Sequence, residues 1–139
     1  MNTTPTEPTI TLNRCDGLFQ RVAIVVEDDF DCQAAMRIML VDLGYRVWVA
    51  GDALEAFDCY REVKYVDLAI VDLMLPILSG AKLISSLTQV DPELPIIATT
   101  GGSFLTTRLR SARIRGAVTV LPKPFGRAEF VQAVRRAAR

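Results

Sequence analysis

Residues 66–80, VDLAIVDLMLPILSG, contain the strongest indication of the fold in this sequence. An almost wholly apolar run ends abruptly at Asp72, and Pro76 and Gly80 interrupt the backbone before a helical pattern begins. A buried central strand of an α/β sheet has this appearance when it delivers one carboxylate to the carboxyl edge of the sheet, where ligands of open sheets bind. Taken alone, Asp72 could equally cap a turn. Its meaning therefore depends on the groups that end the other strands.

Outside this stretch, short runs of β-branched and apolar residues alternate with segments whose apolar residues recur at helical spacing. Four further strands are predicted at residues 21–26, 45–50, 95–99 and 117–121. Five helices are predicted at residues 30–43, 52–60, 79–90, 103–115 and 127–138. Strands that alternate with helices over short links predict a five-stranded parallel sheet covered on both faces. Right-handed crossovers make it a doubly wound α/β fold.

Each predicted helix carries an apolar stripe that we expect to face the sheet. In the first helix this stripe is Ala35, Ile38, Met39 and Leu43. In the other helices the inward positions are Ala53, Ala56, Phe57 and Tyr60; Leu83, Ile84 and Leu87; Leu105, Leu109 and Ala112; and Phe130, Val131 and Val134. Asp52 and Ser79 stand where N-caps are expected.

The composition restricts the class of protein. The 139 residues are half hydrophobic, which suits one globular domain, and we expect residues 1–20 to form a partly mobile N-terminal arm ahead of a domain at 21–139. Sixteen basic residues balance sixteen acidic ones, so net charge favours neither nucleic acid nor an anionic membrane. Histidine is absent, which excludes His-based acid–base catalysis and most zinc sites. The three cysteines lack the spacing of metal ligands, which suits free thiols in a reducing compartment. The sequence shows neither a signal peptide nor an apolar run long enough to span a membrane, so we expect a cytoplasmic protein.

Four of the five predicted strands end in polar groups. These are the acidic trio Glu27, Asp28 and Asp29, then Asp72, Thr100 and Lys123. Individually, the trio could favour a helix N-terminus, Thr100 could be a turn hydroxyl, and Lys123 could be solvated. Parallel strands place all their carboxyl ends on one edge, so we expect these groups to share a cleft.

Such a cleft predicts a metal site and a phosphoryl acceptor. Two or three neighbouring carboxylates repel one another and cannot all stay ionised unless a cation joins them. Oxygen ligands without His or paired Cys select Mg²⁺, or Mn²⁺, over zinc. The metal and a lysine would offset the charge of an incoming phosphoryl group, a hydroxyl would donate to it, and one carboxylate would attack in line.

These residues resemble a known family. The EDD after VV, the VDLMLPILSG block, the TG pair at Thr100 and LPKPF together resemble the receiver domain of bacterial two-component response regulators, as in the single-domain, CheY-like chemotaxis regulator. The resemblance covers about residues 21–138 and implies the flavodoxin-like version of the fold. It implies that Asp72 is the phosphoacceptor, that Thr100 is the switch hydroxyl and that Lys123 pairs with the phosphate. The implied metal ligands are Asp28, Asp72, the backbone carbonyl of Met74, and Glu27 mainly through water.

The resemblance also predicts how the signal arrives and leaves. The donor would be a histidine kinase or a histidine phosphotransfer protein, and a stand-alone domain would signal by contact with a downstream protein. The output face would comprise the helix at 103–115, the strand at 117–121 and the last helix, whose arginines could also support a homodimer. Val120 stands where the family usually has Tyr or Phe, and Ser79 where Asp is frequent. Val120 puts the usual aromatic switch in doubt.

The sequence agrees less well with three other functions. A phosphatase or phosphotransferase of the haloacid dehalogenase type needs a second Asp two residues after the nucleophile, where this chain has Met74. A degenerate receiver that only binds partners disagrees with the complete set of acids, Thr100 and Lys123. Direct nucleic acid binding is not expected, because no helix-turn-helix or interleaved aromatic residues accompany the arginines. The leading hypothesis is a signalling domain rather than an enzyme.

Overall fold

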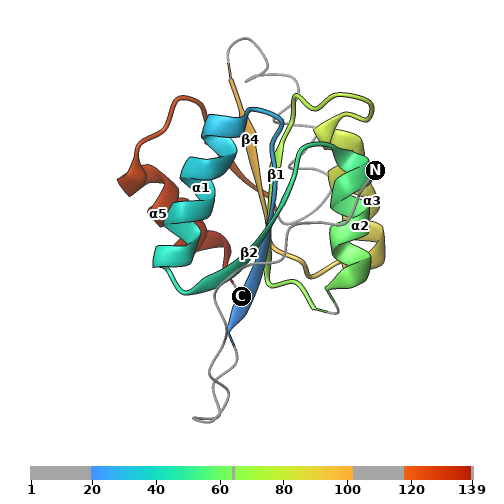
Figure 1. The fold of residues 1–139 in the computed structure, drawn as a ribbon, viewed down its shortest axis with the longest axis horizontal. Coiled ribbons are helices and arrows are strands. Elements are labelled where there is room, and N and C mark those ends of the chain that lie inside the picture. Colours follow the sequence, from blue (N-terminus) through green and yellow to red (C-terminus); the bar gives the residue numbers. More distant parts are fainter. Residues whose placement is uncertain (1–19, 64, 102–117, 139) are drawn as a thin grey trace.

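The computed structural model describes residues 20–63, 65–101 and 118–138 (Figure 1). The described elements are β1 (Arg21–Val26), α1 (Phe30–Asp42), β2 (Tyr45–Ala50), α2 (Ala53–Glu62), β3 (Leu68–Asp72), α3 (Gly80–Val90), β4 (Ile96–Thr100), β5 (Val118–Pro122) and α5 (Arg127–Ala137). The five strands pair in parallel in the order β2-β1-β3-β4-β5. This confirms the doubly wound parallel sheet, with β3 at its centre. The N-terminal arm and the helix expected at 103–115 lie outside the described residues.

The helices form a layer on each side of the sheet. Figure 1 shows α1 and α5 on one face and α2 and α3 on the other. Two apolar clusters fill the spaces between the layers, one around Met36, Leu40 and Phe130 and the other around Leu83 and Ile84. Because both faces are covered, β3 and β4 are buried along their whole length. Among the described helices, none has the length and apolarity needed to cross a bilayer.

The helix starts follow the predicted caps. The side chain of Asp52 accepts from Glu55 N at 2.9 Å, and that of Ser79 accepts from Lys82 N at 3.3 Å. Each bond satisfies a backbone donor that has no partner within its own helix. Both predicted N-caps are confirmed, and Ser79 begins the helix that follows the loop after β3.

The predicted inward face of α1 is wrong. Met36 and Leu40 are completely buried, whereas Ala35 is exposed and Ile38 is 57% exposed. Met39 and Leu43, from the predicted stripe, are only half-buried. The helix is apolar nearly all round, so two stripes one residue apart, or about 100° around the axis, are almost equally apolar. Packing against the sheet therefore determines which of the two stripes is buried.

The other helices agree better with prediction. Leu83, Ile84 and Leu87 are buried as expected. In α2 the third buried position is Cys59, while Phe57 and Tyr60 pack at the margin of the core. In α5, Ala133 is buried and Val131 only half-buried, next to the expected Phe130 and Val134.

The corrected face of α1 predicts how substitutions change stability. Met36→Ala removes a fully buried side chain and should lower the free energy of unfolding by about 2–5 kcal/mol. Ile38→Ala, the matched control, should change it by less than about 0.5 kcal/mol because Ile38 faces solvent. Urea unfolding monitored by circular dichroism measures both. A larger loss in Ile38→Ala than in Met36→Ala would contradict the observed packing.

Candidate functional site

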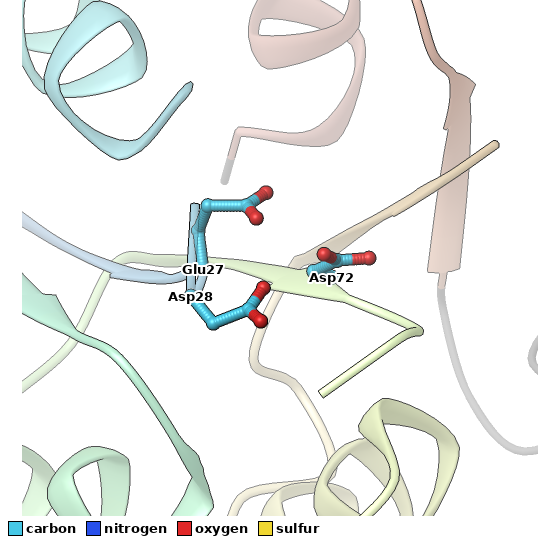
Figure 2. Close-up of side chains that lie close together, drawn as sticks. All are labelled: Glu27, Asp28 and Asp72. Atoms are coloured by element: carbon cyan, nitrogen blue, oxygen red, sulfur yellow. The ribbon is translucent and has the colours of Figure 1, made fainter. Parts of the chain in front are cut away.

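Three carboxylates meet at the carboxyl edge of the sheet. Glu27 and Asp28 follow the end of β1, and Asp72 is the last residue of β3 (Figure 2). One carboxylate oxygen from each lies within 4.8 Å of the others. Glu27 is 1% exposed and Asp72 is 5% exposed, while Asp28 faces solvent. The predicted convergence of these acids is therefore observed, with one open side.

Lys123, which directly follows β5, joins the two buried carboxylates. Its Nζ donates to Glu27 Oε1 at 2.8 Å and to Asp72 Oδ2 at 3.3 Å. The Lys123 side chain is 26% exposed, so the ammonium lies at the border between the cluster and solvent. One positive charge thus partly balances three negative ones.

The backbone around the acids fixes their orientation. Met74 N donates to Asp72 Oδ1 at 2.9 Å, and Asp29 N donates to Glu27 Oε2 at 3.1 Å. Lys123 N donates to the carbonyl of Thr100 at 2.6 Å, which ties the lysine to the end of β4. Glu27, Asp72 and Lys123 are thus each held in place at the end of a strand.

Gly80 permits the close approach of α3 to this edge. A Cβ added at Gly80 would lie 2.1 Å from the carbonyl oxygen of Asp72, a contact that no side chain tolerates. Gly80 N also donates to Leu73 O at 3.2 Å. The glycine that ends the VDLAIVDLMLPILSG stretch is therefore a steric requirement of the site.

Burial and charge alter the titration of the pair. Burial raises the pKa of the Glu27 carboxyl above its ordinary 4.5, although hydrogen bonds from Lys123 and the Asp29 backbone partly oppose this. For Lys123, burial works to lower the pKa of the ammonium, but its hydrogen bond to Glu27 and the charge of Asp72 outweigh burial and raise it. Lys123 therefore stays charged.

The donor set fits a hard divalent cation. All three groups offer carboxylate oxygens, the ligands that Mg²⁺ prefers, and the exposed side of Asp28 leaves room for water ligands. The negative charge that Lys123 leaves uncompensated would be offset by such an ion. Zinc is disfavoured because neither His nor Cys belongs to this cluster among the described residues.

The acidic trio divides into two roles. Asp29 is the N-cap of α1, and its Oδ1 accepts from Cys32 N at 3.0 Å. The cap interpretation was thus correct for one acid, while Glu27 and Asp28 belong to the cluster.

The hydroxyl of Thr100 lies at the same edge. Thr100 is fully buried, and its Oγ1 has no hydrogen-bond partner within the described part of the chain. The neighbouring Thr99, which the sequence did not single out, has the same properties and pairs in register with Asp72. A buried hydroxyl without a hydrogen-bond partner lowers the stability of the fold. Two such hydroxyls in succession give the otherwise apolar β4 a polar end. The TT pair before two glycines was the signal that could have revealed Thr99.

The two cysteines that the structure describes lack the properties of nucleophiles. Cys32 and Cys59 are free thiols. Burial raises the pKa of Cys32 to about 11, with help from the charge of Glu27, and burial raises that of Cys59 to about 12. Both therefore remain protonated at neutral pH and lack nucleophilic character.

Comparison with known proteins agrees with this geometry. The sequence profile of the response regulator receiver domain matches residues 23–135. The chain belongs to this family. The receiver is therefore a signalling module rather than a classical enzyme, its acidic cluster is typical of receiver Mg²⁺ sites, and receiver domains interact with histidine kinases.

Individual relatives differ in length from this chain. It is 31% identical over 114 residues to the probable transcriptional regulator ycf29 of Porphyra purpurea, covering 81% of this chain and 54% of that protein. It is 37% identical over 105 residues to the transcription factor SKN7 of Candida albicans, covering 73% and 18%. The chain thus spans about half or less of these curated relatives.

Solved structures show the same fold. A putative response regulator from Chloroflexus aurantiacus superposes with a TM-score of 0.77 at 26% identity, covering 86% of this chain and 98% of that one. The chemotaxis protein CheY4 of Vibrio cholerae superposes with a TM-score of 0.78 at 21% identity, covering 86% and 99%. The second likeness concerns the fold alone.

The loop between β3 and α3 contains a strained residue. Ile77 has a φ of +72°, in the left-handed region that β-branched residues rarely adopt. It is the central residue of a γ-turn in which Leu78 N donates to Pro76 O at 2.7 Å. Its side chain is 75% exposed, so packing does not compensate the strain.

Relief of this strain should raise the free energy of unfolding by a measurable amount. Ile77→Asn should raise the free energy of unfolding by about 1 kcal/mol, because Asn tolerates the left-handed region and little packing is lost. Ile77→Val, which keeps the β-branch, should stay within about 0.5 kcal/mol of wild type. Guanidinium unfolding measures both variants. A loss of stability in Ile77→Asn would show that the turn is not strained.

The raised pKa of Glu27 predicts a pH dependence of stability in metal-free protein. An acid whose pKa rises on folding stabilises the fold fully below its ordinary pKa, here 4.5, and loses that contribution as pH rises through its folded pKa. In chelator, unfolding free energy should therefore fall more steeply with rising pH above 4.5 in wild type than in Glu27→Gln. Glu62→Gln, an exposed control, should keep the wild-type slope. An equal dependence of the unfolding free energy on pH in wild type and Glu27→Gln would contradict the raised pKa of Glu27.

Proposed function

We propose that this receiver accepts a phosphoryl group on Asp72 from a phosphohistidine of a partner protein, with Mg²⁺ bound at the acidic cluster. The observation that carries the proposal is the cluster itself. Three carboxylates lie within 4.8 Å of one another, and Lys123 Nζ lies 3.3 Å from Asp72 Oδ2. A structural ion pair would need only one acid, whereas this edge collects three around a solvent-facing opening.

Each residue has a distinct part in the transfer. An oxygen of Asp72 forms a bond to phosphorus while the bond from phosphorus to the donor's histidine nitrogen breaks, and that nitrogen regains its electron pair. Met74 N holds Oδ1 of Asp72, which leaves Oδ2, on the Lys123 side, as the oxygen directed to the opening. Lys123 then pairs with the phosphoryl oxygens, and the Thr100 hydroxyl donates to one of them.

Mg²⁺ would be held by Asp28 and Asp72, by the carbonyl of Met74, and by Glu27 mainly through water. When bound, the ion offsets the negative charge that gathers as the donor approaches. Manganese would serve in the same coordination. The buried Glu27 keeps its contact with Lys123, which supports its indirect role at the metal.

The donor partner would be a histidine kinase or histidine phosphotransfer protein. An apolar hollow of about 460 Å³ adjoins Lys123 and is lined by Cys32, Ala35, Met39, Pro124 and Phe125. Phe30, which follows the acidic trio in sequence and begins α1, is 78% exposed. An apolar rim around a charged opening suits a protein donor better than a free phosphate.

The output would leave through β5, α5 and the helix expected at 103–115, by contact with a downstream protein or a second copy of the chain. Val120 in β5 is half-buried and has no ring to turn inward. Movement of the backbone after Thr100 is therefore the proposed route from the phosphoryl group to this face.

Asp72 should be the residue that accepts the phosphoryl group. Incubation with acetyl phosphate and Mg²⁺ should add one phosphoryl mass to the intact protein, and Asp72→Asn should abolish the addition because an amide does not attack phosphorus. Asp28→Asn should slow labelling by weakening metal binding. Asp31→Asn, an exposed acid in the first turn of α1, should label as wild type. Labelling of Asp72→Asn, or equal labelling in chelator, would refute the proposal.

The phosphorylated form should be long-lived. Hydrolysis needs a water in line with the phosphoryl group, and Met74, two residues beyond Asp72, cannot act as a base for it. The phosphorylated Met74→Asn variant should therefore lose its phosphoryl group several-fold faster than wild type, because an amide can orient that water. Met74→Leu is the control that keeps an apolar side chain. A time course of dephosphorylation after removal of the donor measures the rates, and an unchanged or slower rate in Met74→Asn would exclude this role of Met74.

A further inference from the structure

A second hollow lies at the opposite edge of the sheet from the acidic cluster. It has a volume of about 450 Å³ and is lined by Arg21, Leu43, Tyr45, Val134, Arg135 and Ala138. Arg21 begins β1 and Glu27 follows the end of β1, so six residues of strand, or about 20 Å, separate this hollow from the acids. The proposed phosphoryl transfer at Asp72 does not involve this hollow.

The sheet and two helix ends build the walls. Arg21 and Tyr45 are partners in the parallel register of β1 and β2, so their side chains leave the sheet on the same face. That face is the one covered by α1 and α5, because Tyr45 belongs to the core cluster between them. Tyr45 is 4% exposed and Val134 is 2% exposed, so they form a fixed floor, while the half-buried Leu43 and Ala138 supply the accessible apolar part of the wall.

The mouth of the hollow is cationic. Arg21 and Arg135 are both exposed, and neither has an ion-pair partner among the residues that the structure describes. The acid at the same end of α1, Asp42, is paired with Arg127 at 3.1 Å. Within residues 20–63, 65–101 and 118–138, two guanidinium groups thus lie unpaired at one opening, with donors suited to carboxylate or phosphate oxygens.

A simpler role for one of these arginines is to stabilise a helix end. Arg135 and Arg136 both stand in the last turn of α5, where cations are favoured by the helix dipole. Arg136 satisfies that role but does not line the hollow. The dipole accounts neither for Arg21, which is on a strand, nor for the apolar inner wall.

We propose that this hollow binds a small amphiphilic anion, in which one carboxylate or phosphate group contacts Arg21 and Arg135 and an apolar body packs against Leu43 and Ala138. The volume is within the range of small-molecule sites, and such sites combine apolar walls with a few polar groups. A purely inorganic anion would leave the apolar wall unused, and a neutral hydrocarbon would leave the arginines unused.

Calorimetric titration of the full chain in chelator tests this site, because without metal the acidic cluster repels anions. The probes are phenyl phosphate, benzoate and inorganic phosphate; the first two distinguish a phosphate from a carboxylate ligand. We expect saturable one-to-one binding of phenyl phosphate or benzoate, and weaker binding of inorganic phosphate. Absence of saturable binding, or binding of inorganic phosphate as tight as that of both aromatic probes, would overturn the proposal.

Variants locate the bound probe. Arg21→Gln combined with Arg135→Gln should weaken binding by about fivefold or more, since two exposed charge contacts are lost. Arg136→Gln, a matched loss of charge on the same helix turn, should leave affinity within about twofold. Circular dichroism confirms that each variant is folded. Equal weakening by Arg136→Gln would reduce the effect to net charge and contradict a site at the hollow.

Discussion

The contacts of Lys123 with Glu27 and Asp72 hold the carboxyl edge of this protein together. The partners lie 96 and 51 residues away along the chain, and only the parallel sheet brings them within hydrogen-bond distance. Two carboxylates buried this deeply would repel strongly if no cation lay between them. The ammonium offsets part of that repulsion, and the proposed Mg²⁺ would offset the remaining negative charge. Fold, charge and proposed chemistry therefore meet at one side chain.

Much of the architecture could be predicted because its signals are local. The almost wholly apolar run that ends at Asp72 indicated a central strand, and the structure buries β3 completely. Asp52 and Ser79 were recognisable as caps because capping depends on neighbouring residues alone. The convergence of Glu27, Asp72 and Lys123 followed from topology, since all parallel strands deliver their ends to one edge.

Features that depend on packing could not be predicted. The sequence of α1 is apolar on nearly every side, so burial of Met36 rather than Ile38 was decided by the shape of the sheet. The left-handed backbone at Ile77 contradicts the preference of its residue type, and no pattern predicts a conformation that the residue disfavours. Arg21 and Arg135 are distant in sequence and meet at one hollow only through the register of β1 with β2 and the placement of α5.

The most direct test of the central claim is to locate the phosphoryl group chemically. After incubation with acetyl phosphate and Mg²⁺, borohydride reduces an aspartyl phosphate to homoserine, and peptide mass spectrometry identifies the modified position. We expect homoserine at position 72 and at no other acidic residue. Homoserine at Asp28 or Asp29, or no reduced residue in protein that carries the phosphoryl mass, would contradict it.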